Sequence, residues 1–130
     1  MNADHLRAFL DGKMSGSELQ AAIEAEVGLW SKTLAERGRS AAITLDGMNA
    51  RYDITPARAL RLLNALLTDA LGQEAFAYVV DALLLEERFR WTSLDARDVL
   101  ESVIAPENRR DLDRRRAWQA REELGLLVKK

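Results

Sequence analysis

The sequence predicts an all-α protein that folds as a single compact bundle of five to six helices. Alanine and leucine are abundant and β-branched residues are sparse, which favours helix over sheet. Helix-start signals followed by apolar residues at helical spacing recur along the chain. A length of 130 residues, 48% hydrophobic and 31% charged, suits one domain with a buried core, so residues 1–130 are expected to form a single domain.

The first helix is expected from about Ala3 to Leu10, ended by an Asp-Gly pair at positions 11–12, because glycine adopts the left-handed conformation without a Cβ clash. Ser15 and Glu18 then have the spacing of a capping box, in which each side chain accepts a hydrogen bond from the other residue's backbone amide. A long amphipathic helix follows and ends near Gly38, with Gly28 as a point of low helix propensity. Its apolar residues at helical spacing are Leu19, Ile23, Val27, Trp30 and Leu34.

Residues 39–54 are the least regular part of the sequence and are predicted to be a connecting loop. The segment 41–45 is compatible with an extended conformation, and one helical turn is expected near 48–52. Thr55-Pro56 begins a third, central helix, since threonine caps helices and proline at the first helical position loses no hydrogen bond. Gly72 interrupts the helical pattern of this third helix, and a fourth helix is predicted from Gln73 to about Leu85.

A second capping box is predicted at Thr92-Ser93-Leu94-Asp95, followed by a fifth helix that stops before Pro106. Residues 106–130 form a charged C-terminal segment, predicted as a helix from about Glu107 to Leu124 with Gly125 as its C-cap. The apolar tail at 126–128 is expected to fold back onto the bundle.

Catalytic chemistry has few candidates. The chain has no cysteine and one histidine, His5, which excludes Ser-His and Cys-His nucleophile pairs and zinc sites. Phosphate-binding and dinucleotide-binding glycine patterns are absent as well. Acid pairs such as Asp95 with Asp98 could hold a cation, but an acid in a first helical turn is also explained by the helix dipole. We expect a non-enzymatic protein with no cofactor and no metal ion.

The first residues lack the basic region and apolar run of a signal peptide, and no stretch approaches the ~20 apolar residues of a membrane span. A cytoplasmic protein without membrane contact is therefore expected.

Charge is distributed unevenly along the chain. Between Leu62 and Glu87 there are five acidic residues and no lysine or arginine, whereas Asn108 to Lys130 carries eight basic residues. The aromatic residues Phe89 and Trp91, flanked by carboxylates on both sides, have the composition of a protein interface with an anchor and a charged rim. A plain solvated face explains the same carboxylates equally well.

Two stretches resemble bacterial immunity proteins. The sequence from Leu6 to Ser15, followed at Glu18 by a helix that reaches Trp30, resembles the opening of the colicin-D-type self-protective immunity family. The block from Ile54 to Glu107 is similar in style to helical immunity proteins found beside toxins. This resemblance implies a non-enzymatic inhibitor whose acidic helical face blocks the cationic site of a cognate toxin. The partner-binding residues that it implies are Asp69, Glu74, Asp81, Glu86, Glu87, Trp91, Asp95 and Asp98.

Two alternatives stay open. The protein could associate with nucleic acid through its arginine-rich last helix, although interleaved acids also indicate a salt-bridged surface helix. It could instead form a homodimer through Leu112, Trp118 and Leu124. A helix-turn-helix centred on Gly72 is not favoured, because its second helix has no basic residue. The candidate residues for nucleic acid are Arg109, Arg110, Arg114, Arg115, Arg116 and Arg121.

Overall fold

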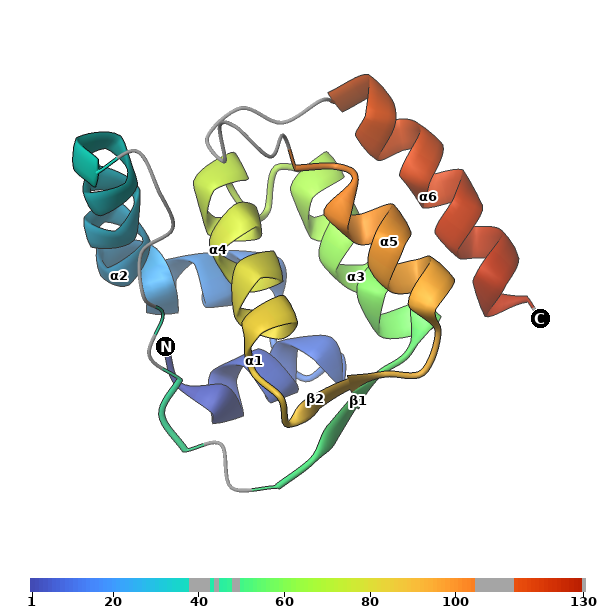
Figure 1. Cartoon of the computed structure of the whole chain (residues 1–130), viewed down its shortest axis with the longest axis horizontal. Coiled ribbons are helices and arrows are strands. Elements are labelled where there is room, and N and C mark those ends of the chain that lie inside the picture. Colours follow the sequence, from blue (N-terminus) through green and yellow to red (C-terminus); the bar gives the residue numbers. More distant parts are fainter. Residues whose placement is uncertain (38–42, 44, 48–49, 105–113, 130) are drawn as a thin grey trace.

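The computed structural model describes residues 1–37, 43, 45–47, 50–104 and 114–129. These residues form six helices and two short strands (Figure 1). In chain order the elements are α1 (Ala3–Leu10), α2 (Gly16–Arg37), β1 (Tyr52–Ile54), α3 (Pro56–Leu67), α4 (Gln73–Leu85), β2 (Phe89–Trp91), α5 (Leu94–Glu101) and α6 (Arg114–Val128). The predicted all-α class is confirmed, apart from the small sheet.

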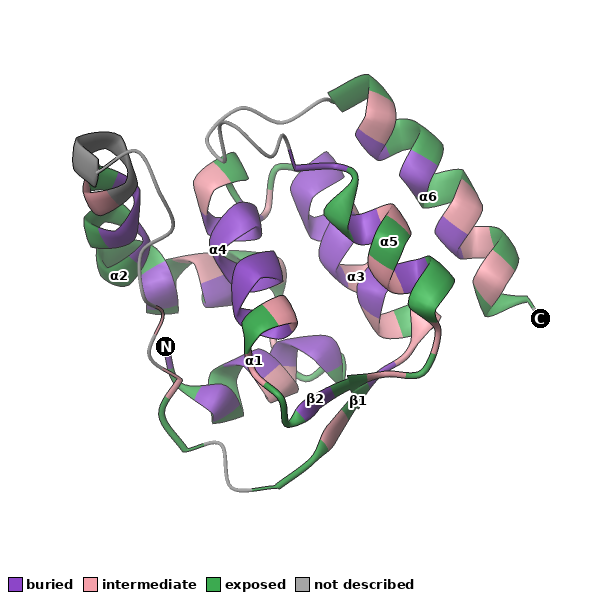
Figure 2. Ribbon diagram, viewed as in Figure 1, coloured by how far each residue is buried: buried purple, intermediate pink, exposed green. Residues whose placement is uncertain are grey.

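Helix α4 is deeply buried in the bundle. It packs against α2 on one side and α3 on the other, and α6 covers α3 and α5 from outside (Figure 1). The α4 residues from Ala75 to Leu83 are all buried, so this helix is covered on every side (Figure 2). Helix α3, which the sequence predicts to be central, contacts α1, α4, α5 and α6.

Local capping interactions set three helix boundaries as predicted. The Ser15 hydroxyl accepts the Glu18 N–H at 3.1 Å, and the Glu18 carboxylate accepts the Ser15 N–H at 3.1 Å. Thr55 caps α3 by accepting the Arg58 N–H at 3.2 Å. Gly12 has φ +83°, the left-handed conformation expected at the end of α1. These are short-range interactions, which explains why the sequence alone predicts them.

The second predicted capping box is wrong in its register. Ser93, not Thr92, caps α5, and its hydroxyl accepts the Ala96 N–H at 3.1 Å. Thr92 instead donates its backbone N–H to the Ile54 carbonyl at 3.1 Å. Pairing with β1 holds Thr92 outside the helix, and this contact is invisible in the local sequence.

The small sheet is the part of the fold that the sequence did not predict. Strands β1 and β2 pair in parallel, with Tyr52 opposite Phe89, Asp53 opposite Arg90 and Ile54 opposite Trp91. Each strand has three residues, too few to show an alternating pattern. The predicted helical turn at 48–52 is wrong at its three described residues, since Ala50 and Arg51 are not helical and Tyr52 begins β1; Met48 and Asn49 lie outside the described residues.

Helix α6 ends later than predicted. It continues through Gly125 to Val128, so Gly125 is not its C-cap and the apolar tail is helical rather than folded back. Leu124 is fully buried and Leu127 packs against the core, and these contacts extend the helix past the glycine. Its predicted start at Glu107 lies outside the described residues.

One apolar cluster joins residues from all six helices and both strands. None of the helices in the described ranges is both long enough and apolar enough to cross a membrane.

Candidate functional site

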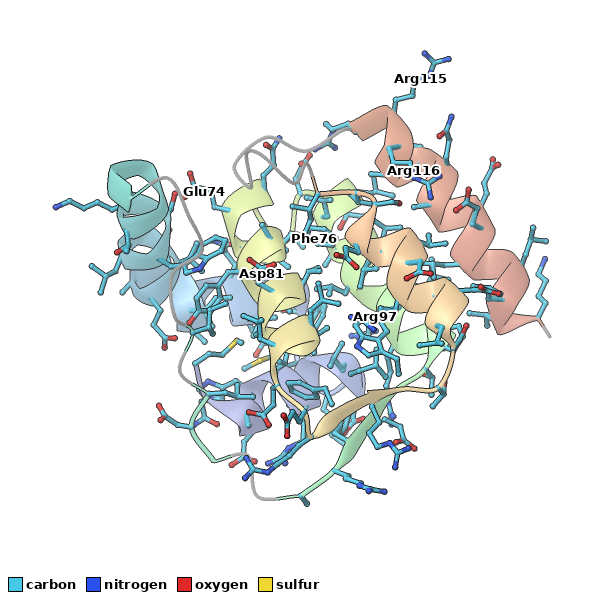
Figure 3. All side chains as sticks on the ribbon, in the orientation of Figure 1. Glu74, Phe76, Asp81, Arg97, Arg115 and Arg116 are labelled. Carbon is cyan, nitrogen blue, oxygen red and sulfur yellow. The ribbon has the colours of Figure 1, made fainter. Side chains whose placement is uncertain are left out.

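The acidic residues implied by the resemblance do not gather into one patch. Glu74 lies in the first turn of α4 and Glu86 directly after its last residue, which separates them by about 18 Å along the helix axis. Figure 3 shows Glu74 near one end of α4 and Asp81 near its middle. Asp69 lies in the turn between α3 and α4, and Asp95 and Asp98 lie on α5.

Two of these carboxylates have basic partners. The Asp69 carboxylate lies 3.4 Å from the Arg114 guanidinium, so an arginine of α6 reaches the turn before α4. The Glu86 carboxylate lies 3.7 Å from the Arg88 guanidinium and accepts the Arg88 N–H at 3.2 Å. The negative charge of Asp69 and Glu86 is therefore partly compensated within the chain, whereas Glu87 is exposed.

The expected exposure of Asp81 is wrong. Its relative exposure is 7%, because α4 is covered on all sides. A docking partner could reach this carboxylate only if the bundle opened.

The remaining carboxylates form a coherent surface on α5. Asp95 and Asp98 are exposed, and so is Glu101, which the sequence analysis did not single out. At 100° per residue, these three residues and Leu94 span about 120° of the helix circumference. Leu94 is 67% exposed and lies within this arc. We call these four residues the α5 acidic face.

The charge of the α5 acidic face is not paired with any basic residue of the described segments. In the part of the chain that the structure describes, the side chains of Asp95, Asp98 and Glu101 make no hydrogen bond and no ion pair. The i,i+3 spacing of Asp98 and Glu101 is the signal that could have identified Glu101, since residues at this spacing share a helix face.

Trp91 does not belong to this face. It lies in β2 opposite Ile54, is half-buried, and lines a depression together with Arg51, Arg58 and Arg90. Its surroundings are therefore basic, contrary to the predicted acidic rim. These arginines are far apart in the sequence, and no local pattern marks them.

The arginines of α6 mainly fasten this helix to the bundle. Arg116 donates to the hydroxyl of Ser102, directly after α5, at 2.8 Å, and within α6 it makes two hydrogen bonds with Glu123, at 2.8 and 2.9 Å. These bonds hold the pKa of the Glu123 carboxyl below its usual value.

Arg121 also attaches α6 to the bundle: it donates to the side chain of Asn64 in α3 at 3.0 Å. Its guanidinium lies over the Trp118 ring. Arg115, by contrast, points away from the bundle (Figure 3). Arg109 and Arg110 lie outside the described residues.

The residues predicted for a homodimer do not share an exposed stripe. Leu124 is fully buried in the chain's own core, whereas Trp118 is 52% exposed. Leu112 lies outside the described residues.

The histidine and the two tyrosines of the chain show no arrangement that indicates catalysis among the described residues. His5 is exposed on α1. The Tyr78 hydroxyl donates to Glu26 at 3.0 Å and the Tyr52 hydroxyl to Asp11 at 2.5 Å. Burial, followed by these hydrogen bonds, raises the pKa of both tyrosines well above the usual value. Within the described segments, no group of three or more histidine, aspartate or glutamate residues could hold a metal ion.

Comparison of the chain with protein-family models, with curated proteins and with solved structures gives no match.

Proposed function

We propose that this chain is a non-enzymatic protein-binding module that docks its α5 acidic face against a basic surface of a partner protein. The observation that carries this proposal is the exposure of three carboxylates around the exposed Leu94, none of which has a basic partner among the described residues. The resemblance noted in the sequence supports one class of partner, a cognate bacterial toxin whose cationic site is blocked in the cytoplasm. The chain would then act as an immunity protein.

The physical basis lies in the arrangement of charge around an apolar centre. A leucine that becomes buried on docking contributes hydrophobic free energy, while surrounding carboxylates steer a cationic partner and exclude partners of like charge. Asp69, Glu86 and Asp81 are not part of this proposal, because the first two have basic partners and the third is buried.

The nucleic-acid alternative receives no comparable support. Arg114, Arg116 and Arg121 contact Asp69, Glu123 and Asn64, respectively. A carboxylate partner offsets the positive charge of Arg114 and Arg116, which weakens their attraction for a phosphate. Among the described acids of α6, Glu123 pairs with Arg116, as expected for a salt-bridged surface helix.

The test begins with affinity capture of partners from the native cell and continues with association rates of the purified partner. Asp98→Lys reverses one charge at the centre of the α5 acidic face. Glu24→Lys makes the same change on the exposed side of α2, on the opposite flank of α4 (Figure 1). We expect Asp98→Lys to slow association at least tenfold at low salt and Glu24→Lys to leave it within twofold of the parent.

Leu94→Ala should mainly accelerate dissociation, because this side chain supplies packing rather than charge. Equal association rates for Asp98→Lys and Glu24→Lys would reject the α5 acidic face as the docking surface.

A further inference from the structure

The depression at the β1–β2 ribbon gathers basic and aromatic side chains at one end of the bundle. It has a volume of about 610 Å³ and is lined by Arg51, Tyr52, Asp53, Arg58, Arg90, Trp91 and Thr92. In Figure 1 the ribbon lies beside α1 and the start of α3. This volume falls within the usual range for small-molecule sites, about 300–1,000 Å³.

Parallel strand pairing brings these residues together. Asp53 of β1 lies opposite Arg90 of β2 in the register, and Trp91 follows opposite Ile54. Arg51 immediately precedes β1, so its side chain joins the same outer surface as that of Asp53, since alternate strand residues share a face. The depression therefore depends on a contact between two segments separated by α3 and α4.

Arg58 is held in a fixed position at the edge of the depression. Its guanidinium donates to the Asp53 carbonyl at 2.7 Å and to the Asp11 carboxylate at 3.1 Å, and lies 4.5 Å from the centre of the Tyr52 ring. Asp11 offsets the charge of Arg58, so Arg58 orders the site more than it attracts a ligand.

Arg51 and Arg90 have different surroundings. Both are exposed, and the described part of the structure gives neither guanidinium a hydrogen bond or an ion pair. Asp53 and Arg90 lie opposite each other in the register, but their side chains form no ion pair within the described residues. Two guanidinium groups are thus available to an anion.

Because Asp11 offsets Arg58, the three arginines and Asp53 leave the site a net charge of +1, in a chain whose overall net charge is −2. A planar guanidinium binds two oxygens of a phosphate or carboxylate at once. The half-exposed Trp91 offers an aromatic surface beside them, on which a planar ring can stack. Asp53 and Thr92 add polar oxygens that can bond ligand hydroxyl groups.

We propose that this depression binds a small phosphate ester that carries a planar ring, of the nucleotide class. Arg51 and Arg90 hold the phosphate, Trp91 contacts the ring, and Asp53 accepts a hydrogen bond from a ligand hydroxyl. This site is distinct from the α5 acidic face, which has the opposite charge.

Three probes separate the contributions of ring and phosphate: adenosine 5′-monophosphate, adenosine and inorganic phosphate. Binding is followed by calorimetry and by chemical shifts of the tryptophan indole and arginine side-chain N–H groups of the full chain. We expect the monophosphate to bind at least tenfold more tightly than either part alone and to shift the Trp91 indole signal but not that of Trp118. Failure of the monophosphate to bind at millimolar concentration would overturn the proposal.

Matched arginine variants locate the site. Arg90→Ala and Arg51→Ala each remove one exposed guanidinium, and we expect each to weaken binding of the monophosphate at least tenfold. Arg115→Ala removes the same charge from the outward-pointing arginine of α6 and should change the affinity less than twofold. An equal loss in all three variants would indicate non-specific charge attraction and reject the site.

A single-stranded tetranucleotide is the final probe. If it binds at least tenfold more tightly than the monophosphate, and this affinity also requires Arg90, the ligand class is a polynucleotide and the small-ligand assignment is wrong.

Discussion

Asp69 shows how a single residue can end a helix against the local sequence signal. The sequence marks Gly72 as the break between α3 and α4, but Gly72 has an ordinary φ of −69° and serves as the N-cap of α4. Asp69 adopts the left-handed conformation instead, with φ +61°. Its N–H donates to the Leu66 carbonyl at 3.1 Å, which closes the last turn of α3. An L-residue in this conformation carries a steric cost that glycine avoids.

Substitution of Asp69 measures this cost. Asp69→Gly and Asp69→Ala both remove the exposed ion pair with Arg114, which contributes little free energy. We expect the glycine variant to be more stable than the alanine variant by about 1 kcal/mol, because only alanine retains the Cβ clash. Urea unfolding of both variants gives the difference. Equal stabilities would show that the backbone at Asp69 is not strained.

At the scale of elements, helix boundaries follow local rules and helix contacts do not. The capping box of α2 and the threonine cap of α3 depend on residues at most three positions apart, so the sequence predicts them. The packing of α6 depends on Ala117, Ala120 and Leu124, all fully buried between this helix and its neighbours. Their contacts carry α6 through Gly125, which the local signal marked as its end.

The two glycines of α2 show the difference between local helix propensity and contacts with other helices within one helix. Gly28 is exposed, and a Cβ placed there would meet no atom within 4 Å. A Cβ at Gly16 would lie 3.0 Å from the Ala70 Cβ and 3.1 Å from the Ala65 Cβ, at the contact between α2 and the end of α3.

We therefore expect Gly28→Ala to raise the free energy of unfolding by about 0.5–1 kcal/mol, as alanine does in a helix interior. Gly16→Ala should lower it or leave it unchanged, because the gain in helix propensity is offset by the close contact with α3. Chemical unfolding of the two variants under identical conditions distinguishes these outcomes. Equal stabilisation by both would show that α2 and α3 can separate without cost.

At the scale of the whole molecule, folding rearranges the charges that the sequence groups by position. Arg114 contacts Asp69, which reduces the acidic character of the segment 62–87, while Asp81 is buried in α4. The exposed acidic surface that results lies on α5, outside that segment. The basic surface without described partners lies at the β1–β2 ribbon rather than only at the C-terminal helix.

The two tyrosines of the chain make the free energy of unfolding depend on pH in the alkaline range. Burial and hydrogen bonds to carboxylates raise the folded-state pKa of Tyr52 and Tyr78 above the unfolded value of about 10. The folded state therefore keeps both phenolic protons at a pH where the unfolded state has released them. The stabilisation is complete below pH ~10 and is lost progressively as the pH rises above it.

We expect no tyrosinate absorbance at 295 nm in the folded protein at pH ~10.5, and ionisation of about three-quarters of the tyrosines on unfolding at the same pH. Tyr52→Phe should remove part of the alkaline loss of stability, since one of the two titrating groups is gone. A rise in tyrosinate absorbance with a midpoint near the usual value, while circular dichroism stays native, would contradict the expectation.

The sequence by itself determined the helical class, the positions at which α1 to α4 begin, and the scarcity of groups for catalysis. These features follow from composition and from interactions between residues three or four positions apart. Only the tertiary structure decided which carboxylates are paired, buried or exposed, and that Arg51 and Arg90 lie beside Trp91. The reason is physical: strand pairing and helix packing join residues that are distant along the chain, and a charge acts on whichever groups folding places beside it.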